Sequence, residues 1–362
     1  MILPSSQPAA PGSPELKLLF WETTARCNLS CRHCRRLASS AQPDELTTQE
    51  VRGVLEGLAE LGRPVVVFSG GEPLLRPDWQ ELTQHARSLG LPIALATNGT
   101  LIDSDLAGRI ATAGFSRVAV SLDAPDAARH DAFRGQAGAF DAALRGIEHL
   151  RVAGLPVQIN STLTAGNADE LDAFYDLALR LGAAAWHLFV LVPVGCGLEL
   201  GQSEQLSAQQ CEEVLGWVCR RQAQGPLDIK VTCAPHYARV ARQFLERHGS
   251  GGPNEPGAQR VASMLRGRGC LAGTGVVFVS SIGEVFPCGY FPVSCGNIRR
   301  HTLGEIWRTS PVLARLRDAS GLTGRCGACE YRQTCGGCRA RALAATGDYM
   351  GPEPACPHVP GE

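Results

Sequence analysis

Short apolar runs alternate regularly with amphipathic stretches from Leu18 to Val190, and this alternation limits the fold more than any other feature. The expected strands are residues 18–22, 65–68, 93–96, 117–121, 157–163 and 185–190. The expected helices between them are residues 47–61, 78–89, 103–113, 140–153 and 169–181. Such alternation predicts a parallel sheet with helices outside it. Because six strands fall short of the eight in a closed barrel, we expect an α/β fold built as a partial (β/α)6 barrel.

The alternation ends after Pro193, and the remaining chain is organised differently. Two further helices are expected at 207–224 and 235–248, a further strand at 227–231, a Gly/Pro-rich linker at 249–257, and a β-hairpin from 276–280 and 283–286. We therefore expect four parts: a disordered tail (1–16), the partial barrel (17–205), a helical connector (206–257) and a cysteine-rich C-terminal domain (258–362).

Composition narrows the class of protein. A formal charge of −1 over 362 residues argues against nucleic-acid binding by bulk electrostatics. The odd number of cysteines, 15, with close spacings, favours metal binding over a disulfide framework. The first residues have no signal-peptide pattern, and the longest apolar stretch, residues 186–198, is too short to span a bilayer. We expect a cytoplasmic protein without a membrane span.

Three cysteines, Cys27, Cys31 and Cys34, follow the first expected strand in a C-x3-C-x2-C spacing. Thiolates select zinc, copper(I) or iron–sulfur clusters, and electron-transfer clusters usually have four cysteine ligands. The next cysteine in the chain is Cys196, so one coordination position is expected to be open. A three-cysteine zinc site completed by His33 is the structural alternative.

Polar or glycine residues follow each of the next four expected strands. They are Gly70, Gly71 and Glu72 after the second strand, Asn98 after the third, Ser121 and Asp123 after the fourth, and Asn160 at the fifth. Ligands of parallel βα folds bind where strand ends converge. Glycines permit close backbone approach, Glu72 could hold an amine, and Asp123 could take ribose hydroxyls. Any single one of these is more often a plain turn, but these four together with the cysteine loop make five on one edge and indicate a binding site.

The cysteine loop followed by Gly-Gly-Glu-Pro resembles the radical S-adenosylmethionine (SAM) superfamily. The resemblance implies that Cys27, Cys31 and Cys34 bind three irons of a 4Fe–4S cluster, while SAM chelates the fourth. It also implies that Gly70, Gly71 and Glu72 hold the methionyl amine. Ser121 and Arg134 would meet the carboxylate and Asp123 the ribose; Asn98 and Asn160 lie at the same cofactor-binding edge. A reduced cluster then supplies the 5′-deoxyadenosyl radical.

A second group of cysteines lies in the last hundred residues and resembles the SPASM extension, which binds auxiliary iron–sulfur clusters. The resemblance implies one or two such 4Fe–4S clusters. Cys326, Cys329, Cys335 and Cys356 would form a complete site, and Cys270, Cys288 and Cys338 would form a second one. The fourth ligand of the second site is undetermined: Cys295 is the nearest candidate, and an open iron is equally possible. Two CxxC pairs could also form a zinc ribbon.

Several segments together, including Cys31–Arg36, Thr232–Tyr237 and Cys335–Arg341, resemble the haem b synthases of the alternative haem pathway. The resemblance implies that iron-coproporphyrin III is converted to haem b by oxidative decarboxylation of two propionates, with a flavodoxin or ferredoxin as electron donor. Candidate contacts to the porphyrin are Arg299, Arg300, Arg332, Arg339, Arg341, His187, His236 and Tyr237.

Other functions stay open at this point. A relative acting in haem d1 biosynthesis shares much of this pattern. A SPASM-type peptide maturase normally carries an N-terminal peptide-binding module, and ~16 residues before the first strand are too few for one. A non-catalytic zinc or redox module is a further alternative. Cys211 and Cys219 are expected core residues, whereas Cys196 and Cys233 could pack or could contact substrate.

Overall fold

The computed structural model describes residues 14–36, 42–248, 256–263, 265 and 269–361. The expected tail up to residue 13, and most of the expected linker (249–255), lie outside these ranges. Among the described residues, no helix combines the length and the apolar character that crossing a bilayer requires.

One ten-stranded sheet forms the centre of the molecule, in the order β10-β9-β8-β1-β2-β3-β4-β5-β6-β7. Its strands are β1 (Leu18–Glu22), β2 (Val65–Ser69), β3 (Ile93–Thr97), β4 (Val118–Ser121), β5 (Val157–Leu163), β6 (Ala185–Val190), β7 (Ile229–Thr232), β8 (Val276–Val279), β9 (Glu284–Phe286) and β10 (Gly296–Asn297). Strands β1 to β7 are all parallel neighbours. The expected partial barrel with a cysteine-rich C-terminal region is confirmed, and β7 lengthens its sheet.

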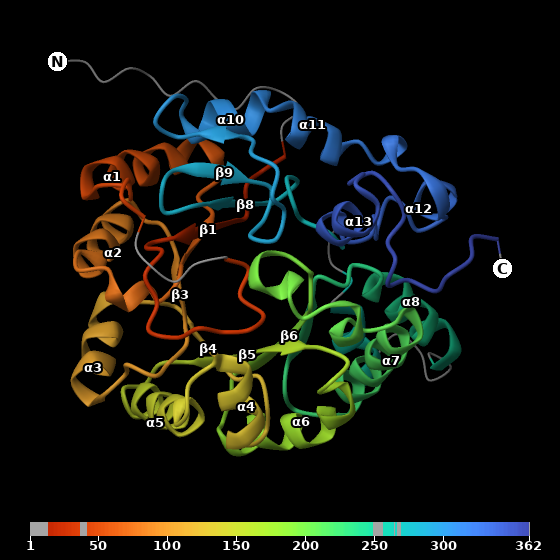
Figure 1. Cartoon of the computed structure of the whole chain (residues 1–362), viewed down its shortest axis with the longest axis horizontal. Helices are drawn as coiled ribbons and strands as arrows, with labels where there is room; N and C mark the ends of the chain where they lie inside the picture. The colour runs from red at the N-terminus through yellow and green to blue at the C-terminus, as the bar shows by residue number, and fades with distance from the viewer. Residues whose placement is uncertain (1–13, 37–41, 249–255, 264, 266–268, 362) are drawn as a thin grey trace.

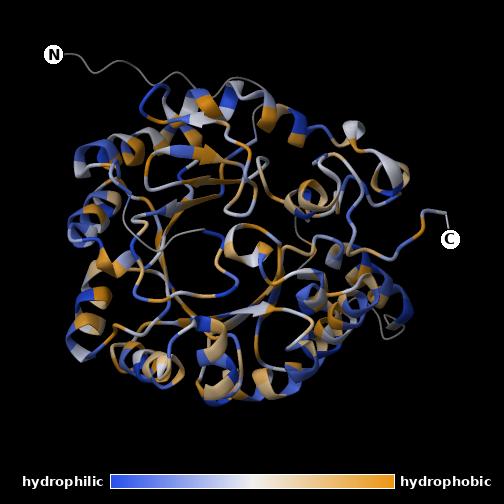
Figure 2. Ribbon diagram, in the orientation of Figure 1, coloured by the Kyte–Doolittle hydropathy of each residue, from blue (hydrophilic) through white to orange (hydrophobic). Residues whose placement is uncertain are grey.

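Helices surround the strands from the outside, as Figure 1 shows. They are α1 (Thr48–Gly57), α2 (Trp79–Ser88), α3 (Ser104–Ala113), α4 (Ala127–Arg134), α5 (Ala139–Val152), α6 (Leu171–Arg180), α7 (Ala208–Gln224), α8 (Tyr237–His248), α9 (Pro256–Ser263), α10 (Leu303–Thr309), α11 (Pro311–Arg317), α12 (Gly324–Ala328) and α13 (Arg339–Thr346). In Figure 2 the outer helices carry both hydrophobic and hydrophilic residues, as expected of helices with one face on the sheet.

Helix boundaries follow local capping chemistry. The Thr47 and Glu50 side chains form the expected capping box of α1, which ends earlier than predicted and continues as a 3₁₀ turn, Leu58–Leu61. Helix α4 was not predicted. It has only eight residues and a weak apolar face, and Asp126 caps it by accepting the Arg129 N–H.

The sheet also joins the two ends of the chain. Strand β8 pairs in parallel with β1, so that Val277 lies beside Leu19. Next to this pairing, Glu22 Oε2 accepts the backbone N–H of Ser281 at 3.0 Å and its hydroxyl at 3.1 Å. The predicted hairpin of β8 and β9 is confirmed, but its parallel pairing with β1 was not predicted. The domain boundary at 258 stays a prediction, while the sheet continues across it.

The two faces of the strands differ in chemistry. In β6, Trp186, Leu188 and Val190 are fully buried in the core between sheet and helices, whereas His187 and Phe189 alternate onto the other face and are only partly buried. Half-buried Ala94 and Ala96 of β3 lie on that inner face as well. The inner face thus carries small, polar and aromatic side chains, and the alanines leave room for a ligand.

Candidate active site and auxiliary cysteine sites

The cysteine loop after β1 packs directly on the Gly-Gly-Glu segment after β2. Backbone bonds join Gly71 N–H to Thr24 O at 2.9 Å and Glu72 N–H to Arg26 O at 2.7 Å. A Cβ atom on Gly71 would lie 2.2 Å from Arg26 O, a separation that real atoms do not show. Gly71 therefore has to be glycine because the cysteine loop occupies the space of a side chain.

The three loop cysteines are partly buried and close enough to influence one another electrostatically. The Leu29 N–H points to Cys27 Sγ at 3.4 Å, and the Arg134 guanidinium lies 3.6 Å from Cys31 Sγ. Burial raises the pKa of Cys27 and Cys31, so the free thiols stay protonated at neutral pH. A bound cation would be needed to hold them as thiolates.

Glu72 is bound by residues at the end of the neighbouring strand. Its carboxylate is fully buried and accepts the Thr97 hydroxyl at 2.8 Å and the Asn98 N–H at 2.9 Å. Burial raises its pKa to about 7. The side chain thus ties the end of β2 to the end of β3; its predicted contact with the methionyl amine stays a prediction.

Asn98 links the same edge to the cysteine loop. Its amide donates to Asn28 Oδ1 at 2.8 Å, and Asn28 donates in turn to the Thr100 hydroxyl at 2.8 Å. Asn28 lies between Cys27 and Cys31, and sequence reasoning did not single it out. The network fixes the loop against β3 independently of any metal.

Asp123 and Arg134 form a buried ion pair at this edge, 2.5 Å between Oδ2 and Nη2. The Thr162 N–H also donates to Asp123 at 2.7 Å, and His33 Nε2 lies 3.7 Å away. Beside it, the His33 ring stacks on Phe133 with 4.2 Å between centroids. The expected carboxylate for a ribose is thus already paired with the expected arginine, and both lie next to Cys31.

Ser121, the last residue of β4, lies in register with Asn160 in the middle of β5. Both are half-buried on the inner face. The Asn160 side chain accepts the Gln158 amide at 2.6 Å, and its backbone carbonyl accepts the Leu122 N–H. The structure therefore brings all the predicted strand-end residues to one edge.

Two observations bear on what this edge binds. Buried His33 Nδ1 and Arg134 Nε have no hydrogen-bond partner, although buried polar atoms are normally satisfied. Three ligands of one zinc ion lie within about 4.8 Å of one another, and among the described residues only Cys329, Glu330 and His358 are grouped so closely. Cys27, Cys31 and Cys34 are therefore spread more widely than the ligands of one zinc ion. His33, the fourth ligand of the zinc alternative, lies beside Asp123 instead. The donor set fits a multi-iron cluster.

Cys326, Cys329, Cys335 and Cys356 all line one hollow of about 450 Å³, counting the space open to solvent. His236 also lines it, and neither of its ring nitrogens has a hydrogen-bond partner although the residue is only 1% exposed. Sulfides of an iron–sulfur cluster accept such hydrogen bonds. The four thiols and the orphaned histidine fit the complete auxiliary cluster predicted from the sequence.

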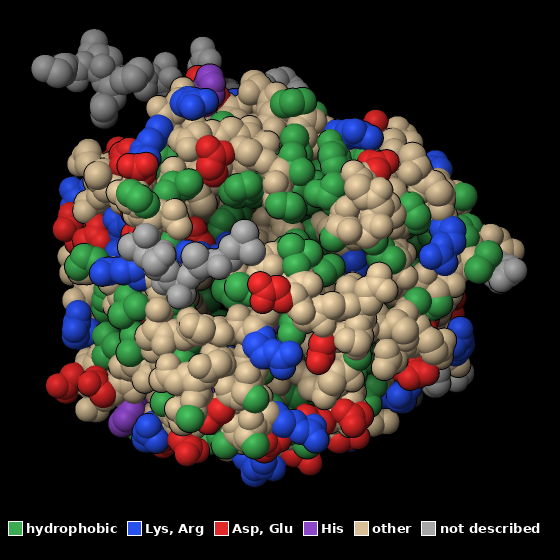
Figure 3. Space-filling model, in the orientation of Figure 1, with side chains coloured by type: hydrophobic (Ala, Val, Ile, Leu, Met, Phe, Trp, Pro, Cys, Tyr) green, Lys and Arg blue, Asp and Glu red, His purple; other side chains and the backbone are tan. Residues whose placement is uncertain are grey.

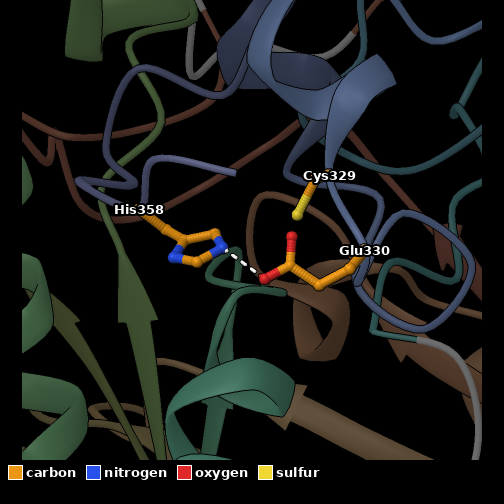
Figure 4. Close-up of side chains that lie close together, drawn as sticks. All are labelled: Cys329, Glu330 and His358. Atoms are coloured by element: carbon orange, nitrogen blue, oxygen red, sulfur yellow. Dashed lines mark hydrogen bonds and ion pairs between the residues drawn. The ribbon is translucent and has the colours of Figure 1, made fainter. Parts of the chain in front are cut away.

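The rim of this hollow carries one further pair. His358 and Glu330 are hydrogen-bonded at 2.9 Å beside Cys329, as Figure 4 shows. These three residues are the compact group of ligand atoms mentioned above. Because Cys329 belongs to the four-cysteine hollow, the pair lies at the edge of that site.

The second set, Cys270, Cys288 and Cys338, also comes together, since the three thiols influence one another electrostatically. Cys295, the nearest candidate for a fourth ligand, lies elsewhere: its thiol contacts Ser310 and lies beside Arg317. Cys295 was suggested by its position in the sequence, but in the structure it does not lie beside Cys270, Cys288 and Cys338.

Three of the arginines expected to bind propionates are engaged by the protein. Arg341 pairs with Glu353 at 3.2 Å, and Arg339 donates to the backbone at Gly351 at 2.7 Å; both arginines are buried. Arg299 is paired with Glu50 at the surface. Arg339 is bound within the cysteine-rich region, whereas Arg341 also donates to the carbonyls of Val190 and Cys233 and so ties that region to the strand ends of the barrel.

Cys196 lies against the far end of the cysteine loop, with its thiol donating to Arg36 O at 2.7 Å. Cys211 and Cys219 are fully buried in the core, as expected. The sequence suggested His33 only as a zinc ligand, whereas its ring lies beside Asp123 at the strand ends. Sequence reasoning missed Glu353, which lies in an irregular segment near Cys356 and offered no local signal.

Comparison with known proteins agrees with this geometry. The model of the radical SAM superfamily matches residues 21–178, and that of the SPASM iron–sulfur cluster-binding domain matches residues 270–339. The structure superimposes on SuiB of Streptococcus suis with a TM-score of 0.73 at 16% identity, covering 95% of this chain and 76% of SuiB. At that identity the likeness concerns the fold alone.

Three curated relatives cover almost the whole chain. An "AdoMet-dependent heme synthase" of Methanosarcina barkeri is 45% identical over 96% of this chain and 97% of that protein. Another with the same name, from Nitratidesulfovibrio vulgaris, is 44% identical over 96% and 94%. A "Pre-heme d1 synthase" of Dinoroseobacter shibae is 33% identical over 98% and 89%. A SAM-bound 4Fe–4S cluster and auxiliary clusters are the cofactors of this architecture. The chain is a radical SAM enzyme with a SPASM domain and belongs to the family of AdoMet-dependent haem synthases.

Proposed function

We propose that this enzyme converts two propionates of iron-coproporphyrin III to vinyl groups and so produces haem b. The observation that carries the proposal is 45% identity to a haem synthase across both cysteine sites and the whole barrel. The inner face of the barrel supports it, because half-buried Ala94 and Ala96 leave space beside the strand ends for a flat substrate. Figure 3 shows hydrophobic side chains gathered below α10 and α11 on one face, which suits a largely apolar ligand.

The reaction balances only with an electron acceptor. Each propionate loses one hydrogen atom from its β-carbon, carbon dioxide from its carboxylate, and one further electron, and a vinyl group is left. When bound, the SAM cluster supplies the radical that takes the hydrogen atom. An auxiliary cluster beside the barrel is a suitable first acceptor for the electron, and a flavodoxin or ferredoxin would reduce the SAM cluster.

The chain's own residues have distinct parts in this proposal. Cys27, Cys31 and Cys34 hold the first cluster, and Gly70 and Gly71 bring backbone up to it. Asp123 and Arg134, with Ser121 and Asn160 opposite, position SAM at the strand ends. Cys326, Cys329, Cys335 and Cys356 hold an auxiliary cluster. A cytoplasmic location would keep these thiols reduced.

A second candidate is a reaction of haem d1 biosynthesis, favoured by the 33% identity to a pre-haem d1 synthase over 98% of this chain. The two candidates differ in their products and can be separated by mass. A peptide maturase has weaker support, from the fold shared with SuiB and from 30% identity to a mycofactocin maturase, against 45% identity to a haem synthase.

The decisive experiment gives the reduced, reconstituted enzyme SAM and iron-coproporphyrin III and follows both products by mass spectrometry. The proposal expects 5′-deoxyadenosine and a porphyrin lighter by two carbon dioxide molecules and four hydrogens. Cys27→Ala should abolish both products, whereas Cys326→Ala should block turnover while SAM cleavage persists. Cleavage of SAM with an unchanged porphyrin would rule out this substrate.

A further inference from the structure

We propose that Cys233 supplies the fourth thiolate of the auxiliary site formed by Cys270, Cys288 and Cys338. The inference rests on the proposed assignment of those three cysteines to a cluster. It adds a residue that is 37 positions away from the nearest of them in the sequence, in a different part of the chain.

The first argument is position. Cys233 directly follows β7, the last parallel strand of the barrel, so it stands at the same carboxyl edge as the other strand-end residues. Its thiol is hydrogen-bonded to the Cys338 sulfur and lies near Cys288. Cys233 and Cys288 both pack on the buried group that contains Cys338 and Phe291. Four thiols from four separate segments thus lie close together.

The second argument is backbone conformation. Cys233 has φ 62°, in the left-handed region, and Arg63 is the one other described non-glycine residue with a positive φ. Such a conformation is costly for a residue with a Cβ and persists where the surroundings require it. The Arg341 guanidinium donates to the Cys233 carbonyl at 2.8 Å and fixes the turn. The turn directs the thiol toward Cys338, and it does so in a strained conformation. A cysteine that only fills space in the core does not require such a conformation.

The third argument is charge. Four thiolates in a buried site need nearby positive charge and hydrogen-bond donors. Arg341 is 3% exposed and lies close to both Cys233 and Cys338. Its partner Glu353 accepts the Cys338 N–H at 2.6 Å and holds that residue in place. The competing ligand, Cys295, contacts Ser310 and lies beside Arg317, which has no such link to the site.

The test uses the full-length chain carrying Cys27→Ala, Cys31→Ala and Cys34→Ala, so that only auxiliary clusters can form. After anaerobic reconstitution, iron and acid-labile sulfide are counted, and the ferricyanide-oxidised protein is studied by electron paramagnetic resonance. Two complete cysteine-ligated clusters should survive oxidation without a three-iron signal. Adding Cys233→Ala should either lower iron and sulfide by about half or produce a three-iron signal, since one iron then lacks its thiolate.

Cys295→Ala in the same background is the matched control and should leave the iron content and the spectrum unchanged. Circular dichroism establishes that each variant is folded. If Cys233→Ala does not fold, Cys233→Ser is used with ⁵⁷Fe Mössbauer spectroscopy, where an oxygen-ligated iron would give a separate component. Unchanged iron and spectra in the folded Cys233 variant, or loss of iron in Cys295→Ala, would overturn the inference. No porphyrin is used, so the result is independent of the proposed substrate.

Discussion

Single residues at the barrel edge have several partners, and Arg134 is the clearest case. It is buried, pairs with Asp123 at 2.5 Å and lies 3.6 Å from Cys31 Sγ. Its guanidinium thus neutralises a buried carboxylate whose pKa would otherwise be raised by burial, and the pKa of Asp123 is lowered. We expect structural and cofactor-binding roles to overlap at this residue.

We predict that Arg134→Gln destabilises the metal-free protein by about 3–5 kcal/mol, because the Asp123 carboxylate is left buried and unpaired. Asp123→Asn combined with Arg134→Gln should cost less than the sum of the two single substitutions. Urea unfolding measures both. Arg151→Gln, which removes an exposed ion pair with Glu148, is the control and should change stability by less than about 1 kcal/mol. Additive effects of the Arg134 and Asp123 substitutions would contradict the coupling.

Stability should also depend on His130. Burial, together with the Arg134 guanidinium, lowers its pKa from 6.5 to about 4, and its Nδ1 accepts the Asp123 N–H at 3.1 Å. The unfolded chain takes up a proton below pH 6.5 that the folded chain refuses until about pH 4, so acid favours unfolding in this window. His130→Asn, which keeps an acceptor but does not titrate, should therefore gain about 2 kcal/mol relative to the unsubstituted protein between pH 7 and pH 5. Urea unfolding at pH 7 and at pH 5 measures this difference. If the free energies of unfolding of the two proteins differ by the same amount at both pH values, the prediction is wrong.

Residue-level prediction from the sequence depends on chemistry that repeats at short spacing. The C-x3-C-x2-C loop and the CxxC pairs single out their cysteines as ligand candidates, whereas the sequence indicates Cys295 as the only candidate for the fourth ligand and a packing or substrate role for Cys233. A ligand donated by a distant strand end leaves no local pattern, since only the fold brings it to the site. The same reason explains why Arg339 and Arg341 were expected to face substrate: sequence gives their charge but not their buried partners.

At the scale of elements, strands β1 to β6 were predicted within one residue because buried parallel strands are short continuous apolar runs. Helix α4 (Ala127–Arg134) was missed since its sequence forms no clear apolar face, and its stability comes from the Asp126 cap and its contacts with α5. Pairing partners separated by most of the chain, such as β1 and β8, were also missed, because periodicity specifies an element and not its neighbour.

The contact between two loops gives a prediction at this scale. Gly71→Ala should displace the cysteine loop, since the added Cβ would lie 2.2 Å from Arg26 O, and should reduce reconstituted iron at the first site. Gly108→Ala is the matched control: Gly108 lies exposed in α3, nothing is within 4 Å of its added Cβ, and alanine should stabilise the helix by about 1 kcal/mol. Iron counting and thermal unfolding are measured for both variants, and only Gly71→Ala should lose iron. Normal iron content in Gly71→Ala would show that the loops can move apart.

For the molecule as a whole, the shared sheet makes the barrel dependent on the C-terminal region. A chain ending at residue 263 lacks β8, so β1 becomes an unpaired edge and Glu22 loses both bonds from Ser281. We predict that this truncated chain aggregates or unfolds without a cooperative transition, as measured by gel filtration and circular dichroism. Full-length Ser281→Ala, which loses only the hydroxyl bond, should stay folded and cost about 1 kcal/mol. A monomeric truncated chain with a sharp transition would show that the barrel is autonomous.

The bond between Glu22 and Ser281 spans 259 positions and has a consequence for biosynthesis. A ribosome adds roughly 5–20 residues per second, so on the order of 13–50 s separates synthesis of the two partners. During that interval the first cysteine triplet is outside the exit tunnel, while the strand that completes its side of the sheet does not yet exist. Iron delivered at this stage would meet a nascent chain with an open edge. We therefore expect cluster insertion to follow release of the chain, and an early thiol-protecting chaperone would raise the yield of active enzyme.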